Sequence, residues 1–132
     1  MIYELGMGWG GLAIAVARRY PDSKVIGFEL SPLPWLIAHM RAMAVASSNF
    51  VCHNRDFLKA DLSDAAIVVC YLSSDVLEKL KPKLERELPV GALVISSTFA
   101  VPGWAALDTV IAKDIYRSPV YLYEMQGVEP PA

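Results

Sequence analysis

The residues best suited to chemistry lie in a glycine cluster near the start of the chain and in a carboxylate further along. The cluster reads Glu4-Leu5-Gly6-Met7-Gly8-Trp9-Gly10-Gly11. Glycines allow positive φ angles and let a ligand approach the bare backbone. Glu29 falls at the predicted end of the second strand, where a carboxylate accepts hydrogen bonds from both hydroxyls of a ribose. Together these residues predict a nucleoside site.

Two kinds of ligand compete for this glycine loop. Gly6, Gly8 and Gly11 fit the G-x-G-x-x-G pattern of dinucleotide folds, whereas Gly6, Gly8 and Gly10 fit the G-x-G-x-G pattern of methyltransferases. Glu4 favours the second ligand, because a carboxylate repels a nearby pyrophosphate but suits the ammonium and sulfonium groups of S-adenosyl-L-methionine. A degenerate or purely structural fold stays open as a third interpretation.

Three more side chains complete the predicted site. Asp56 follows the third predicted strand, where its carboxylate can accept the adenine amino group, although Asp also suits any turn. Tyr71 and Ser73 follow the fourth strand, and we expect them to position a methyl acceptor, with core packing as the alternative for Tyr71. We predict no metal site, because Cys52 and Cys70 lack metal-ligand spacing.

These residues need a sheet that brings strand ends together. The apolar pattern alternates strands with helices, as in an α/β fold of the Rossmann-like, doubly wound kind. The predicted strands are 1–5, 24–29, 49–52, 66–72 and 92–99, followed by a hairpin of 109–116 and 119–125. The predicted helices are 11–20, 35–46 and 75–88, the last kinked or split at Pro82. We therefore expect five parallel strands with crossover helices and a terminal antiparallel hairpin.

Composition narrows the class of protein. The 132 residues are 55% hydrophobic and 20% charged, which fits one folded domain. The net charge of -2 gives no general attraction for nucleic acid or anionic lipid. No apolar stretch reaches the roughly 20 residues of a membrane span, and no signal peptide is visible. We therefore expect a cytoplasmic location, no membrane span and no nucleic-acid partner.

Several segments resemble a known family across nearly the whole chain. The segments are Tyr3–Gly10, Gly27–Pro32, the later Arg41, Lys79–Leu88 and Phe99–Trp104. They resemble the class I lysine methyltransferase family that includes the ATP synthase c-subunit methyltransferase and its prokaryotic relatives. The glycine motif is common to all class I methyltransferases, whereas Lys79–Leu88 and the Pro102/Trp104 pair are more specific.

The resemblance implies an enzyme that transfers a methyl group from S-adenosyl-L-methionine to a protein lysine. Asp75 and Trp104 are then expected near the acceptor site, as an acidic and aromatic rim for the incoming cation. A small-molecule methyltransferase and a non-catalytic binding or assembly domain remain as alternatives. No residue is identified as an obligatory general base.

Residues 1–132 are expected to form a single S-adenosylmethionine-binding domain, apparently without the N-terminal covering segment that the family usually has. The terminal hairpin carries many apolar and aromatic side chains. Strands at the side of a sheet must be covered or paired, so we expect a homodimer that buries part of this hairpin or the neighbouring helices. The alternative is a monomer in which those side chains pack on their own sheet.

Overall fold

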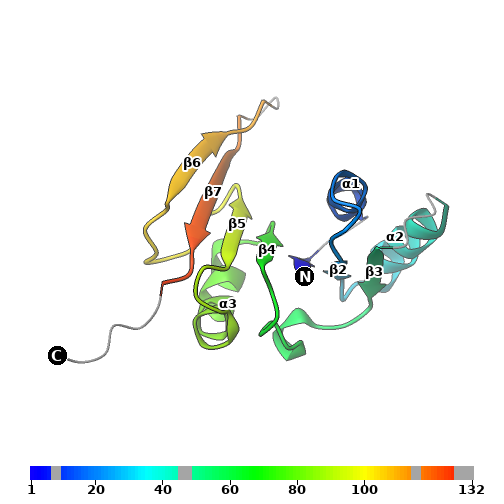
Figure 1. Cartoon of the computed structure of the whole chain (residues 1–132), viewed down its shortest axis with the longest axis horizontal. Helices are drawn as coiled ribbons and strands as arrows, with labels where there is room; N and C mark the ends of the chain where they lie inside the picture. Colours follow the sequence, from blue (N-terminus) through cyan, green and yellow to red (C-terminus); the bar gives the residue numbers. More distant parts are fainter. Residues whose placement is uncertain (7–9, 45–48, 114–116, 127–132) are drawn as a thin grey trace.

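A seven-stranded sheet runs through the computed structural model, which describes residues 1–6, 10–44, 49–113 and 117–126 (Figure 1). The strands lie in the order β3-β2-β1-β4-β5-β7-β6. Their bounds are β1 Ile2–Leu5, β2 Val25–Phe28, β3 Phe50–His53, β4 Ile67–Cys70, β5 Leu93–Ser97, β6 Asp108–Ile111 and β7 Pro119–Glu124. The helices are α1 Gly11–Arg19, α2 Pro32–Ala44 and α3 Ser74–Glu87, with a 3₁₀ turn, η1, at Phe57–Lys59.

Strands β1 to β5 run parallel to one another, and β7 runs antiparallel to both β5 and β6. The prediction of a mostly parallel α/β sheet with an antiparallel hairpin is therefore confirmed. The single reversed strand is β7, and it lies inside the sheet, so the outermost strand β6 points the same way as β5. The C-terminal ends of the parallel strands meet at one side of the sheet, here called the carboxyl edge; the opposite side is the amino edge.

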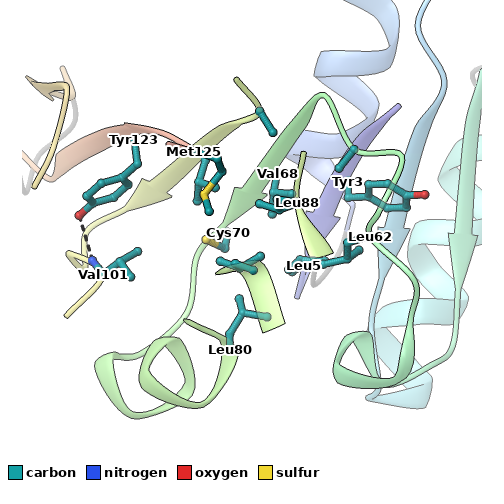
Figure 2. Close-up of a cluster of buried hydrophobic side chains, with 14 of the residues drawn as sticks. Tyr3, Leu5, Leu62, Val68, Cys70, Leu80, Leu88, Val101, Tyr123 and Met125 are labelled. Atoms are coloured by element: carbon teal, nitrogen blue, oxygen red, sulfur yellow. Dashed lines mark hydrogen bonds between the residues drawn. The ribbon is translucent and has the colours of Figure 1, made fainter. Parts of the chain in front are cut away.

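Two apolar clusters hold the helices on opposite faces of the sheet. Helices α1 and α2 lie on one face near β1, β2 and β3, and α3 lies on the other face below β4 and β5 (Figure 1). The α1 and α2 side is built on Ala13, Ala17 and Ala38, whose small side chains are fully buried. The α3 side is larger, and Figure 2 shows part of it, with Leu80, Val68 and Cys70 stacked between α3 and the sheet.

Several predicted boundaries and connections were wrong. Helix α2 starts at Pro32, three residues before the predicted start, because proline is well tolerated in the first helical turn. Helix α3 runs unbroken through Pro82; the buried Leu77, Leu80 and Leu84 anchor it to the sheet on both sides of the proline. The crossover from β3 to β4 holds only η1 and no α-helix.

The segment between β5 and β6 also lacks a helix. It leaves the carboxyl edge after Ser97 and must run back toward the amino edge, because β6 is parallel to β5 and begins level with Ile95. Val101 is buried along this path, and its N–H donates to the Tyr123 hydroxyl at 2.9 Å (Figure 2). Strand β6 ends at Ile111, whereas its prediction extended to Tyr116, and residues 114–116 lie outside the described part of the chain.

Candidate functional site

Strand register brings the predicted site residues to one edge. Leu5 at the end of β1 lies beside Phe28 of β2 and Cys70 of β4. Gly6, Glu29 and Tyr71 directly follow these three residues, so the chain leaves all three strands at the same carboxyl edge. In open parallel sheets, ligands bind at this edge, where the strand order reverses. The order β2-β1-β4 places that reversal at β1.

Glu4 is the most unusual side chain at this edge. It lies in β1 between Gly27 and Val69 and is only 7% exposed. No hydrogen bond or ion pair joins its carboxyl group to another described residue. Burial raises its pKa from 4.5 to about 7, because a low-dielectric setting disfavours the charged form. A positive charge nearby would stabilise the charged form of this carboxyl group, so the setting favours a cationic ligand.

Backbone conformation and close packing both favour glycine at positions 6 and 10 of the loop that follows Glu4. Gly6 has a φ of 71°, and an added Cβ would lie 2.9 Å from the Leu72 side chain. Gly10 has a φ of 82°, and an added Cβ would lie 2.8 Å from the Cβ of Ala38 in α2. Gly10 therefore permits close packing of α1 on α2, whatever its role toward a ligand. The predicted role of Gly8 lies outside the described residues.

Glu29 lies in a loop that several hydrogen bonds hold in place. One carboxylate oxygen accepts from the Ser31 N–H at 3.1 Å, and the Glu29 N–H donates to the His53 carbonyl at 3.0 Å. The Asn54 side chain donates to the carbonyls of Glu29 and Leu30 at 2.9 and 3.0 Å. Asn54 is thus a positioning residue that the sequence analysis missed; its signal was a short amide side chain directly after a strand.

Asp56 follows β3 at the same edge and is half-buried. One of its carboxylate oxygens accepts from the Leu58 N–H at 3.0 Å and caps η1. This is the turn-forming role that was the alternative for Asp56, and it uses one oxygen only. The contact with adenine stays a prediction.

Tyr71 and Ser73 lie at the carboxyl edge of β4, as predicted. Tyr71 is 62% exposed, so the alternative of core packing was wrong. Ser73 is the N-cap of α3; its carbonyl accepts from Leu77 N–H at 2.9 Å, but its hydroxyl makes no capping bond. Both residues are exposed at the edge where an acceptor would enter, and their role in positioning it remains a prediction.

The predicted position of Trp104 near the acceptor was wrong. Its indole N–H donates to the Glu85 carboxylate at 2.8 Å, and its ring contacts Tyr123. Glu85 lies eleven residues into α3 from Ser74, about 16 Å along the helix axis. The reason is topological: the segment that carries Trp104 must run back toward the amino edge before β6. Asp75 stays near the carboxyl edge, in the first turn of α3.

Residues 4–108 match the family described as the ANTKMT methyltransferase domain. The chain belongs to this family. It is 31% identical over 126 residues to a protein-lysine N-methyltransferase of Saccharolobus islandicus, covering 93% of this chain and 78% of that relative. It is 35% identical to the mouse adenine nucleotide translocase lysine N-methyltransferase, covering 96% of this chain and 54% of the relative. The human lysine N-methyltransferase of the ATP synthase c-subunit is 31% identical, with 86% of this chain and 51% of the relative covered.

A solved structure shows the same fold over nearly the whole chain. It is an RNA methyltransferase from Salinibacter ruber in complex with S-adenosyl-L-homocysteine, with a TM-score of 0.88 and 30% identity, covering 99% of this chain and 84% of that one. The chain spans about half the length of the mouse and human relatives.

Family membership makes S-adenosyl-L-methionine the cofactor and methyl transfer the chemistry. The residues fit this cofactor, because the buried Glu4, whose carboxyl group has no partner among the described residues, suits a cation and would oppose a pyrophosphate. Within the described ranges, no cluster of three metal-ligating side chains occurs, and no helix has the length and hydrophobicity of a membrane span.

Proposed function

We propose that the chain transfers the methyl group of S-adenosyl-L-methionine to the side-chain amine of a protein lysine. The observation that supports this most directly is the buried Glu4 at the carboxyl edge, whose carboxyl group has no partner among the described residues and which lies near Gly6 and the exposed Tyr71 and Ser73. The archaeal, mouse and human relatives are named as lysine methyltransferases. Their names supply the acceptor class that the geometry alone leaves open.

The chain's own residues would act mainly by binding and orientation. When bound, the cofactor supplies an electrophilic methyl group on a sulfonium. Glu4 would balance the positive charge of the cofactor, and Glu29, fixed by Ser31 and Asn54, would hold the ribose. Tyr71 and Ser73 would orient the lysine amine for in-line attack. Proximity and orientation of this kind account for a large part of such rate enhancements.

The lysine must lose a proton before it attacks, since the reference pKa of its ammonium is about 10.4. Burial of the acceptor stem against the Tyr71 ring would lower that pKa by desolvation. No described side chain at the carboxyl edge is assigned as a base. The proton is therefore expected to leave to solvent.

RNA is the second candidate acceptor, because the Salinibacter ruber structure carries that name at 30% identity. The net charge of -2 argues against it, since nucleic-acid binding rests on positively charged surfaces. A small molecule, or no acceptor at all, are the other outcomes to be separated.

One labelling experiment separates these outcomes. The protein is incubated with methyl-labelled S-adenosyl-L-methionine and a cell extract, and samples are then treated with protease or nuclease. We expect label in protease-sensitive material and methyl-lysine after acid hydrolysis, with the Glu29→Ala variant as the inactive control. Nuclease-sensitive label would identify RNA as the acceptor, and low-mass label would identify a small molecule. Cofactor binding without any transfer would support the non-catalytic domain.

We further propose a homodimer and a cytoplasmic location. Every residue of β6 is exposed, including Val110 and Ile111. An outer strand with exposed apolar side chains is a ready template for pairing with a second copy.

Cys52 and Cys70 are free and buried thiols, which suits a reducing compartment.

A further inference from the structure

A cavity lies at the amino edge of the sheet, opposite the cofactor edge. Its volume is about 330 Å³, and its walls include Glu85 of α3, Trp104 and the C-terminal end of β7 at Glu124. Glu124 lies beside Leu93, the first residue of β5, which places this cavity at the amino edge. A cavity of this size is at the small end of the usual range for ligand sites, roughly 300–1,000 Å³.

The half-buried Trp104 supplies the accessible aromatic surface of this cavity, and Tyr123, only 2% exposed, packs behind it. The rings of Trp104 and Tyr123 have centroids 5.5 Å apart and an interplanar angle of 68°. Both rings are fixed: the indole N–H donates to Glu85 at 2.8 Å, and the Tyr123 hydroxyl accepts from the Val101 N–H at 2.9 Å (Figure 2). Rings held in this way are already in position before a ligand binds, which lowers the entropic cost of binding.

Carboxylates also line this cavity. One Glu85 oxygen is used by the indole, and no hydrogen bond or ion pair joins the Glu124 carboxylate to another described residue. Lys81 is the opposing charge, because its Nζ would lie 2.7 Å from a Cβ built on Gly103, another cavity residue. Two carboxylates against one ammonium leave the cavity net negative.

We propose that this cavity binds the methylated ammonium group of a lysine side chain, as a site separate from the one where methyl transfer takes place. Aromatic faces attract alkylammonium groups through the ring quadrupole, and methylation suits such a site because it adds apolar surface to the cation. Carboxylates at the rim add the matching charge. The proposal goes beyond the proposed function, because it concerns recognition of a lysine that already carries methyl groups.

Nuclear magnetic resonance of the full chain tests this directly. Trimethyl-lysine, blocked at both ends, is titrated into the labelled protein while the three tryptophan indole signals are followed. Trp104→Phe identifies which signal belongs to Trp104. We expect that signal to shift saturably in the millimolar range, whereas the neutral analogue norleucine leaves it unchanged. Saturating S-adenosyl-L-homocysteine should not compete, because its site lies at the opposite edge.

Variants that change the charge of the cavity should change its affinity for trimethyl-lysine in opposite directions. Glu124→Gln and Glu85→Gln should weaken binding about three- to tenfold while keeping the shape of the cavity. Lys81→Met should strengthen it. Glu78→Gln, on an exposed position of the same helix two turns from Glu85, is the matched control and should change nothing.

Three results would overturn the proposal. One is no saturable shift of the Trp104 signal in a wild-type protein that is folded and binds S-adenosyl-L-homocysteine. Another is equal affinity in wild type, Glu124→Gln and Lys81→Met. The third is a shift with phosphocholine but not with trimethyl-lysine, which would assign the cavity to choline headgroups. None of these readouts needs turnover, so they are independent of whether the chain methylates lysine.

Discussion

Among single residues, Glu4 and Glu29 carry different parts of the cofactor site. Glu4 is buried and makes no contact with a described hydrogen-bond partner, whereas Glu29 is part of a network with Ser31, His53 and Asn54. Burial raises the pKa of the first, and a bound cation would lower it. The second is held in position before the ligand arrives. Substitutions at the two sites should therefore have different signatures.

Replacing Glu29 by alanine should weaken cofactor binding by about 10- to 100-fold, because hydrogen bonds to a charged group contribute roughly 1.5–3 kcal/mol. Isothermal calorimetry with S-adenosyl-L-homocysteine measures this. Asp22→Ala, an exposed carboxylate in the turn after α1, is the control. Unchanged affinity in a folded Glu29→Ala protein would remove Glu29 from the ribose role.

Glu4 should make the stability of the free protein depend on pH. Its pKa is about 7 when folded and has an ordinary value of 4.5, so the folded state holds the proton more tightly than the unfolded state. Stability is then lost as the pH rises from about 4.5 to 7, by up to roughly 3 kcal/mol. Relative to wild type, Glu4→Gln should therefore gain stability over this window.

Urea unfolding of both proteins at several pH values checks this expectation. The quantity to follow is the difference in free energy of unfolding between Glu4→Gln and wild type. A difference that stays constant from about pH 4 to about pH 8 would mean that the pKa of Glu4 is ordinary and that its carboxyl group is not desolvated.

At the scale of helices and strands, Gly10 sets how closely α1 and α2 approach. Gly10→Ala should destabilise the fold by about 2–4 kcal/mol, from the left-handed backbone and from overlap with Ala38. Gly91→Ala is the matched control: Gly91 has a similar φ of 87° but no atom within 4 Å of an added Cβ. It should lose only about 1–2 kcal/mol.

Chemical denaturation of the two alanine variants distinguishes backbone strain from packing. Equal losses would show that the contact with Ala38 relaxes freely. A larger loss of stability for Gly10→Ala would confirm that the close packing of α1 on α2 requires a residue without a side chain at position 10.

The sequence predicted most of this architecture because hydrophobic periodicity and glycine position are local signals. The five parallel strands and the positions of Glu4, Gly6, Gly10 and Glu29 were found where the structure places them. Trp104 was placed at the wrong edge, because the direction of its segment depends on β7 lying between β5 and β6, a long-range pairing. Pro82 was expected to kink or split α3; the helix is not split, because buried leucines on both sides outweigh the lost hydrogen bond. Asn54 was missed because its hydrogen bonds reach back across twenty-five residues.

For the whole molecule, the outer strand β6 is the feature that bears on assembly. Val110 and Ile111 are 59% and 51% exposed, and the strand is the last in the sheet order. We expect a dimer at micromolar concentration, seen as a concentration-dependent sedimentation coefficient. Val110→Lys should shift the equilibrium to monomer, since a charge blocks pairing of an exposed strand.

Val90→Lys is the control for this experiment, because Val90 is 74% exposed in the turn before β5, away from β6. A single monomeric species at every concentration would contradict the dimer. The exposed side chains of β6 would then only flank β7 within their own sheet.

The position of β7 inside the sheet also fixes an order of events during synthesis. Residues that form β1 to β4, with Glu4 and Glu29, leave the ribosome first and can pair among themselves. Strand β5 then has one neighbour only, since its other partner is β7, and β6 emerges with no partner at all. The cofactor half can therefore assemble early, whereas the amino-edge cavity waits for residues 119–126. A chain interrupted before Pro119 would keep the glycine loop but expose both β5 and β6 to other nascent chains.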